Sequence, residues 1–163
     1  MLVGLKLLRG EVYTRDNSTQ IMRLMGLDVG DKRIGVAVSD DSELIASPKE
    51  TVERRGTRKD VAHLLEIARR EEVAEIVVGM PYSLDGSEGP QAAKVRRFIE
   101  AVEDQTELPV TTWDERYTTV VAEEMLHEVS ASRTGRKKNV DRVAAALILQ
   151  GYLDKKRESG PKP

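Results

Sequence analysis

The sequence predicts a mixed α/β fold, and three observations lead to this class. Strand-like segments with short connections come first, helix-like and strand-like segments then alternate, and a long helix-like segment follows near the end. Short connections suit an antiparallel meander, whereas strands separated by helices need right-handed crossovers and run parallel. We therefore expect a mixed sheet with helices on both faces, in which the later strands run parallel to the first.

The first half of this pattern contains three strands and a helix. We predict strands at Arg23–Val29 and Arg33–Ser39, joined by a turn at residues 30–32, and a third strand at Leu44–Val52. Pro48 has no N–H for a central ladder, so this third strand is expected at an edge of the sheet. A helix is predicted at Thr57–Glu71, because its apolar residues recur at helical spacing.

The second half alternates between the two element types. The apolar run Ala74–Met80 predicts a buried strand, and a glycine-containing loop then leads to a helix opened by Pro90. A short strand is predicted at Pro109–Trp113. Helices are expected at Thr118–Val129 and Val140–Lys156, with a basic loop, residues 130–138, between them.

Length, composition and charge limit the class of protein. The 163 residues predict one domain, and 26 Lys and Arg against 28 Asp and Glu exclude a uniformly basic nucleic-acid coat protein. The absence of cysteine excludes disulfides, thiolate zinc sites and a cysteine nucleophile. The longest uncharged apolar run, Val143–Leu149, is far shorter than the ~20 residues that span a bilayer. We expect a soluble, cytoplasmic protein that does not interact with membranes.

The domain is expected to occupy residues 22–157. Residues 1–21 are interpreted as an N-terminal appendage, either disordered or upstream of the true start, because a turn-prone cluster at residues 16–19 precedes a second plausible start at Met22. Residues 158–163 end in Ser-Gly-Pro-Lys-Pro and are predicted to be a disordered tail.

Acidic residues at three places in the sequence are the candidate functional residues. Asp28 lies in an otherwise apolar strand, where a carboxylate is unfavourable unless it is paired or binds a cation; alternatively it only ends the strand. Asp114 and Glu115 end the Pro109–Trp113 strand, where such a pair is also common as a solvated strand end. Asp141 lies in the first turn of the last helix, where an acid also suits the helix dipole. Together the three places supply the carboxylate ligands that Mg²⁺ or Mn²⁺ chemistry on phosphodiesters requires.

The motifs around these acids resemble the YqgF family of bacterial ribonuclease-H-like proteins. These proteins are related to Holliday-junction resolvases and are described as pre-16S rRNA nucleases. The resemblance runs from about Met22 to Arg157 and rests on Gly26-Leu27-Asp28-Val29-Gly30, Ile34-Gly35-Val36-Ala37, Gly79-Met80-Pro81, Trp113-Asp114-Glu115-Arg116-Tyr117-Thr118-Thr119 and Val140-Asp141 with Ala144-Ala145.

The resemblance implies a five-stranded sheet of order 3-2-1-4-5 with the second strand antiparallel. It also implies that Asp28, Glu115 and Asp141 are the catalytic, metal-binding residues, with Mg²⁺ or Mn²⁺ as cofactor, in maturation of the 5′ end of pre-16S rRNA. Related resolvases carry their middle acid after the fourth strand, so Asp85, in the loop that follows it here, is an alternative ligand, as is Asp114.

Basic residues support a polyanionic substrate. Residues 133–142 contain five basic side chains against one acid, and Arg136, Lys137 and Lys138 are predicted to bind substrate because their loop leads to Asp141. Arg116, beside Glu115, is expected to bind a phosphate or to orient the carboxylate. Residues 54–59 form a second basic cluster, and the third, Lys94, Arg96 and Arg97, is interpreted as a solvated helix face.

Other functions remain open at this level. The nearest is a resolvase-like DNA endonuclease acting on Holliday junctions, and another is a non-catalytic rRNA-binding factor in ribosome assembly. Asp-x-Gly followed by Gly-Val-Ala also resembles the phosphate loop of actin-like ATPases, but those folds pair two such domains. The expected partner is nucleic acid, pre-16S rRNA rather than a DNA junction, and with it a pre-ribosomal particle; the protein is expected to be a monomer or a homodimer.

Overall fold

A five-stranded mixed sheet forms the centre of the protein. The computed structural model describes residues 22–118, 122, 124, 127–128 and 137–160. Its sheet has the order β3-β2-β1-β4-β5, with β1 (Arg23–Val29), β2 (Arg33–Ser39), β3 (Ala46–Glu53), β4 (Val73–Met80) and β5 (Val110–Asp114). Strands β2 and β3 form an antiparallel meander with β1, whereas β4 and β5 run parallel to it. The predicted sheet order and strand directions are confirmed.

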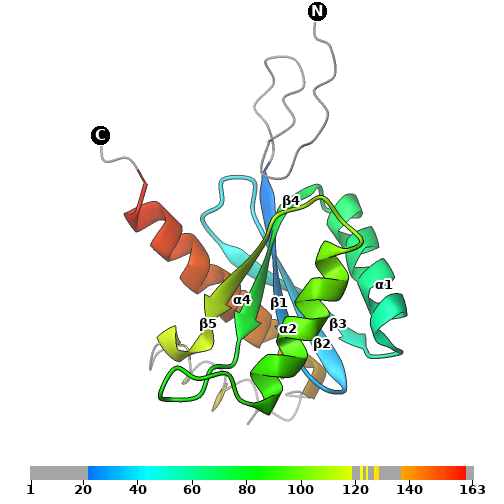
Figure 1. Ribbon diagram of the computed structural model, residues 1–163. Helices are drawn as coiled ribbons and strands as arrows, with labels where there is room; N and C mark the ends of the chain where they lie inside the picture. The colour runs from blue at the N-terminus through cyan, green and yellow to red at the C-terminus, as the bar shows by residue number, and fades with distance from the viewer. Residues whose placement is uncertain (1–21, 119–121, 123, 125–126, 129–136, 161–163) are drawn as a thin grey trace, which may run out of the picture.

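Helices cover both faces of this sheet, as predicted. Helices α1 (Thr57–Arg70) and α2 (Pro90–Glu103) lie on one face, and α4 (Lys137–Glu158) crosses the other (Figure 1). Both α1 and α2 begin at the end of the sheet where β1 ends, and so does α4. The C-terminal end of β1 is therefore surrounded by the first turns of three helices.

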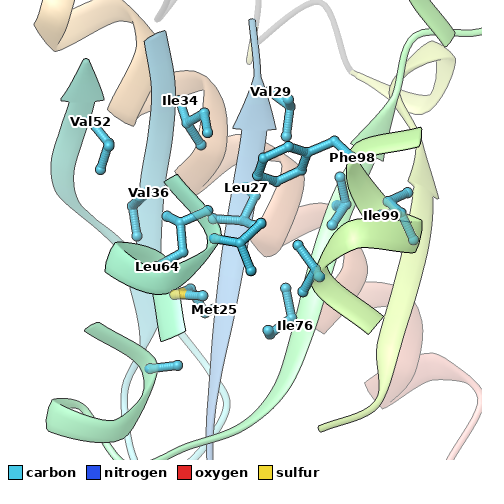
Figure 2. Close-up of a cluster of buried hydrophobic side chains, with 14 of the residues drawn as sticks. Met25, Leu27, Val29, Ile34, Val36, Val52, Leu64, Ile76, Phe98 and Ile99 are labelled. Atoms are coloured by element: carbon cyan, nitrogen blue, oxygen red, sulfur yellow. The ribbon is translucent and has the colours of Figure 1, made fainter. Parts of the chain in front are cut away.

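The main core fills the space between the sheet and the pair α1 and α2. Alternation along β1 directs Met25, Leu27 and Val29 to this side, where they pack with apolar residues of α1 and α2 such as Leu64 and Phe98 (Figure 2). Met25 and Leu27 are fully buried. This core fixes β1 in depth and direction.

A smaller core joins α4 to the opposite face. Leu24 of β1 and Val77 of β4 pack there against Ala145, Leu149 and Leu153 of α4, whose exposures are all 1% or less. Small residues bring the helix close, because a Cβ added at Gly26 would lie 2.9 Å from the carbonyl oxygen of Ala145. The β1 residues that alternate with Met25, Leu27 and Val29 therefore face α4.

Strand β3 is shorter at its start than predicted, and its edge position is confirmed. The backbone N–H groups of Leu44 and Ile45 donate to the carboxylate of Asp40, at 2.8 and 3.1 Å, so these two residues belong to the loop before β3. Pro48 lies beside a register shift in the β2–β3 ladder, where its missing N–H is tolerated.

The second half of the chain shows further differences from the sequence-based expectation, besides shifts of one residue in the bounds of β4 and β5. Residues Glu115–Tyr117 form one turn of 3₁₀ helix directly after β5, which the pattern did not predict. Helix α4 begins at Lys137 instead of Val140 and continues to Glu158 instead of Lys156. Most of the predicted helix Thr118–Val129 and of the basic loop 130–138 lies outside the described residues. No helix in the described part of the chain is long and apolar enough to cross a membrane.

Candidate acidic site

Asp28 is the centre of the candidate site. It alternates with Leu27 and Val29 of the main core, so it occupies the α4 face of β1, one residue before the strand ends. In the antiparallel ladder it lies opposite Gly35 of β2. The parallel register places Gly79 of β4 next in line after the paired residues Leu27 and Val78. Because both neighbours are glycine, neither adjacent strand places a side chain of its own beside Asp28.

Gly35 allows α4 to reach the sheet at Asp141. A Cβ added at Gly35 would lie 1.9 Å from the carbonyl oxygen of Asp141 and 3.0 Å from the backbone nitrogen of Arg142. Any larger residue at position 35 would therefore push the beginning of α4 away from β2. The close approach places Asp141 beside the strand position that pairs with Asp28.

Gly79 allows the side chain of Glu115 to lie close to the sheet, as Gly35 does for the backbone of Asp141. Glu115 follows β5, which lies two strands away from β1, a separation of roughly 10 Å at the usual spacing of strands. A Cβ added at Gly79 would lie 2.6 Å from Oε1 of Glu115 and 3.2 Å from its Cγ. The Glu115 side chain therefore extends across β4 over this glycine, toward Asp28.

Glu115 and Asp141 are both close enough to affect the carboxylate of Asp28. Burial raises the pKa of Asp28 to about 7, and the negative charges of Glu115 and Asp141 contribute to this rise. Burial, followed by the charge of Asp114, also raises the pKa of Glu115. The site thus concentrates negative charge in partly buried surroundings, and a bound cation would relieve it.

Arg33 is a member of the site that the sequence analysis missed. Its Nε donates to Oδ2 of Asp141 at 2.7 Å, in an ion pair whose side chains are 23% and 26% exposed. Arg33 and Gly35 are two residues apart on β2 and therefore share the α4 face. The alternation of residues along β2 can be read from the sequence, but the pairing of Arg33 with Asp141, 108 residues later, cannot.

The donor set fits a hard divalent cation. Asp28, Glu115 and Asp141 offer only carboxylate oxygens, the ligands that Mg²⁺ and Mn²⁺ prefer. Across the part of the chain that the structure describes, no three acidic or histidine residues are already gathered as closely as a metal centre needs. The Arg33 ion pair holds one of the two carboxylate oxygens of Asp141, Oδ2. A cation that binds this oxygen would compete with Arg33 for it.

Asp114 and Arg116 form a separate unit beside the site. The Asp114 carboxylate accepts hydrogen bonds from the backbone nitrogen, Nε and Nη2 of Arg116, at 2.6–3.1 Å. These bonds lower the pKa of Asp114. The Arg116 guanidinium also lies 5.8 Å from the ring centre of Tyr82 and donates to the carbonyl of Leu84 at 3.5 Å. Arg116 therefore orients Asp114 and the loop after β4.

The remaining sequence candidates lie elsewhere or are not described. The Asp85 carboxylate accepts from the backbone nitrogen and Oγ of Ser87, at 2.9 and 2.6 Å, which holds it within its own loop. Arg136 lies outside the described residues. Lys137 and Lys138 are the first two residues of α4, and only their backbone is described.

Comparison with known proteins identifies similar sequences. Residues 22–155 match the model of the RuvX family, described as Holliday junction resolvase. A protein of Desulforamulus reducens named "Putative pre-16S rRNA nuclease" is 50% identical over 133 residues, which cover 82% of this chain and 97% of the relative. Proteins of the same name from Symbiobacterium thermophilum and Clostridioides difficile are 48% and 50% identical, covering 86% and 84% of this chain and 98% and 97% of the relatives.

Solved structures confirm the expected ribonuclease-H-like fold. The structure of Thermus thermophilus RuvC in complex with a Holliday junction substrate matches with a TM-score of 0.53 at 21% identity, covering 82% of this chain and 96% of that one. The fowlpox virus Holliday junction resolvase matches with a TM-score of 0.52 at 13% identity, covering 82% of this chain and 99% of that one. At these identities the similarity is one of fold.

Proposed function

The chain belongs to the RuvX family, in agreement with its YqgF-type motifs, and from this premise we propose that it is a metal-dependent nuclease that matures the 5′ end of pre-16S rRNA. The family relationship supports hydrolysis of phosphodiester bonds, and the names of the relatives support the rRNA precursor as substrate. On this proposal the enzyme acts in the cytoplasm, on the precursor alone or within a pre-ribosomal particle.

One observation carries the chemical part of the proposal. Three carboxylates from β1, α4 and the turn after β5 converge at Asp28, and their repulsion contributes to a pKa of about 7 for this residue. A protein core does not gather charge in this way without a function or a partner. Asp28, Glu115 and Asp141 would together hold Mg²⁺ or Mn²⁺. When bound, such an ion polarises the phosphodiester and neutralises the charge that develops on its oxygens.

The residues of the chain contribute position and charge. Asp28 is fixed by the core below β1 and must lose its proton to act as a ligand, so we expect the affinity for a divalent cation to rise with pH up to about 7. Gly35 and Gly79 allow Asp141 and Glu115 to approach it. Arg33 forms an ion pair with Asp141. If the Asp141 carboxylate bound a cation instead, the Arg33 guanidinium would be free to contact a phosphate of the substrate.

The test is cleavage by the purified protein of a small-subunit rRNA precursor with a 5′ extension, in Mg²⁺ or Mn²⁺. Wild-type protein should shorten the RNA, and Asp28→Asn, which removes one charge and keeps the side-chain shape, should abolish cleavage while still binding RNA. Full activity of Asp28→Asn would contradict the proposed role of this carboxylate. Wild-type protein that binds the precursor but never cuts it would instead support a non-catalytic role in ribosome assembly.

A second candidate function is resolution of four-way DNA junctions, and the description of the matching family favours it. A junction has two strands to cut, so a resolvase needs two active sites and therefore a dimer. A four-way DNA junction belongs in the same assay, together with a measurement of the mass of the protein in solution. Junction cleavage by a dimer, without RNA cleavage, would replace the rRNA proposal.

A further inference from the structure

An open cavity of 380 Å³ lies on the other side of the β1 strand end, between the first turns of α1 and α2. Val29 and Phe98, which lie side by side in Figure 2, form its apolar floor. Its walls are polar and come from the turn after β1, from the residues around the start of α1, and from α2. This pocket is separate from the acidic site, which occupies the α4 face.

Two basic clusters that are distant in the sequence meet at this pocket. Arg54 belongs to the cluster at residues 54–59, which contains four basic residues and no acid, and it lines the pocket. Lys94 and Arg97 belong to the cluster on α2 and line the same pocket. The sequence analysis interpreted the α2 cluster as a solvated helix face. Arg96 of this cluster does not line the pocket and contacts Glu88 and Tyr82.

Arg54 is a fixed part of the wall. Its Nε donates to Asp60 at 3.0 Å, its Nη1 to the carbonyl of Gly30 at 3.1 Å, and its Nη2 to the hydroxyl of Thr57 at 3.4 Å. Its guanidinium also lies over the ring of Phe98, 5.1 Å from the centre. Because Asp60 is almost completely buried, this network ties the turn after β1 to the start of α1. The pocket is therefore pre-formed.

The cations on α2 are available to a ligand. Arg97 is exposed, and its side chain has no hydrogen-bond or ion-pair partner among the residues that the structure describes. Lys94 contacts Asp31 at 3.2 Å, but both side chains are more than half exposed. Such an exposed ion pair contributes little to stability, so an anion can displace it. Asp31 is the one carboxylate among the lining residues. Because Arg54 is paired with buried Asp60, Lys94 and Arg97 supply the positive charge that a ligand can reach.

The position of the pocket relates it to the acidic site. Gly30 lines the pocket and follows Asp28 by two residues, roughly 7 Å along an extended chain. The two sites lie on opposite faces of the sheet, but both open at the end of β1, where a bound strand can pass from one face to the other. We propose that this pocket binds a backbone phosphate of the nucleic-acid strand, a few nucleotides from the bond that is cut. This inference rests on the proposed function and names a second contact with its substrate.

Binding measurements test the pocket independently of cleavage. Single-stranded RNA from the 5′ extension is titrated in EDTA and followed by fluorescence anisotropy at several salt concentrations. Arg97→Gln should weaken binding about 5-fold at low salt and reduce the slope of log affinity against log salt by about 0.7, the value for one phosphate contact on a single strand. The matched control is Arg69→Gln, the same change at an exposed site in the last turn of α1, which should leave both quantities unchanged.

A second readout locates the RNA on the surface. The chain has no cysteine, so Gln91→Cys places a single thiol in the pocket wall, and Arg69→Cys places one at the far end of α1. Bound RNA should slow the reaction of the pocket thiol with a thiol reagent several-fold and leave the other unaffected. Equal affinity and salt slope for Arg97→Gln and Arg69→Gln, or no protection of the pocket thiol, would overturn the proposal.

The outcomes separate this inference from the proposed function. RNA binding that depends on Arg97, without any cleavage in Mg²⁺ or Mn²⁺, would contradict the nuclease and retain the pocket. Cleavage together with binding that is indifferent to Arg97 would retain the nuclease and eliminate the pocket. Wild-type protein that binds no RNA would contradict both.

Discussion

Asp28 is the central residue of the acidic site, and its carboxylate has a strongly raised pKa. A carboxylate on an apolar strand already indicated a functional position, and in the structure burial, together with the charges of Glu115 and Asp141, raises its pKa to about 7. Its ordinary pKa is 3.8, so folding favours the protonated form. The consequence is a dependence of stability on pH that can be measured without any substrate.

In metal-free protein, Asp28→Asn should raise the free energy of unfolding at pH 8. Because the folded pKa lies above the unfolded one, the contribution of Asp28 to wild-type stability falls as pH rises from about 4 to about 7, and its full penalty is present above that range. The pKa difference corresponds to at most about 4 kcal/mol. Urea unfolding in EDTA at pH 4 and pH 8 measures it. If Asp28→Asn increased the free energy of unfolding equally at both pH values, the pKa of Asp28 would not be raised in the folded protein.

Arg33→Gln should increase affinity for Mn²⁺ about 10-fold, or ~1.4 kcal/mol, because the guanidinium competes with the cation for Asp141 and adds positive charge beside it. Isothermal titration calorimetry measures this change. Arg23→Gln is the matched control, since Arg23 forms a similar ion pair with Asp41, at 2.6 Å, at the other end of β1. Unchanged or weaker Mn²⁺ binding by Arg33→Gln would mean that the ion pair positions Asp141 instead of blocking it.

At the scale of elements, glycines decide how closely α4 and the turn after β5 approach the sheet. Gly35 lies against the backbone of α4, and Gly79 lies under the side chain of Glu115. The two glycines border the position of Asp28 on neighbouring strands. The site therefore depends on these two glycines, because a side chain at either position would displace Asp141 or Glu115.

Gly79→Ala tests the path of Glu115. The new methyl group would meet Glu115 Oε1 at 2.6 Å and Ile148 Cδ1 at 2.5 Å, both ends of flexible side chains. We expect a loss of about 1–2 kcal/mol of stability, the usual effect of overpacking, and a loss of about 10-fold in Mn²⁺ affinity. Thermal unfolding and calorimetry measure the two effects.

Gly56→Ala provides the comparison for that variant. The φ of 113° at Gly56 strains any residue with a Cβ, and no atom of the described residues, its chain neighbours aside, lies within 4 Å of the new methyl group. It should lower stability and leave the Mn²⁺ affinity of the folded protein unchanged. If Gly79→Ala bound Mn²⁺ as tightly as Gly56→Ala, Glu115 would not be a ligand.

The sequence predicted the elements better than their contacts. All five strands were located from the sequence, and apolar character explains β1, β2 and β4, which are mostly buried, better than β3 and β5, which are mostly half-buried or exposed. The sequence analysis missed the 3₁₀ turn at Glu115–Tyr117, which depends on Asp114 accepting a hydrogen bond from the backbone nitrogen of Arg116. It could not show how Glu115 approaches Asp28, since that path depends on Gly79 of a different strand.

At the scale of the whole molecule, one end of the sheet carries the functional features. The acidic site lies on the α4 face at the end of β1, and the basic pocket lies at the same end between α1 and α2. Sequence reading could find the two basic clusters as charge runs but not their meeting, which is a property of the packing of α1 and α2. A polyanionic strand would be repelled by the acidic site while that site holds no cation and attracted by the pocket, so a divalent cation and substrate should bind cooperatively.

A chain that begins at Met22 should fold as stably as the full chain. The first strand begins at Arg23, and the family match begins at residue 22. We expect unfolding temperatures within about 2 °C of each other, since no core residue of the described domain is removed. Thermal unfolding of both proteins in the same buffer measures this. A much less stable shorter chain would make residues 1–21 a part of the domain.

The most direct measurement of the central claim is the anomalous diffraction of crystals grown with Mn²⁺. The account predicts a manganese peak bounded by the carboxylates of Asp28, Glu115 and Asp141, with the Arg33 contact to Asp141 broken, and no such peak in Asp28→Asn crystals. Manganese bound elsewhere, or an Asp141 that remains paired with Arg33 at saturating Mn²⁺, would contradict it.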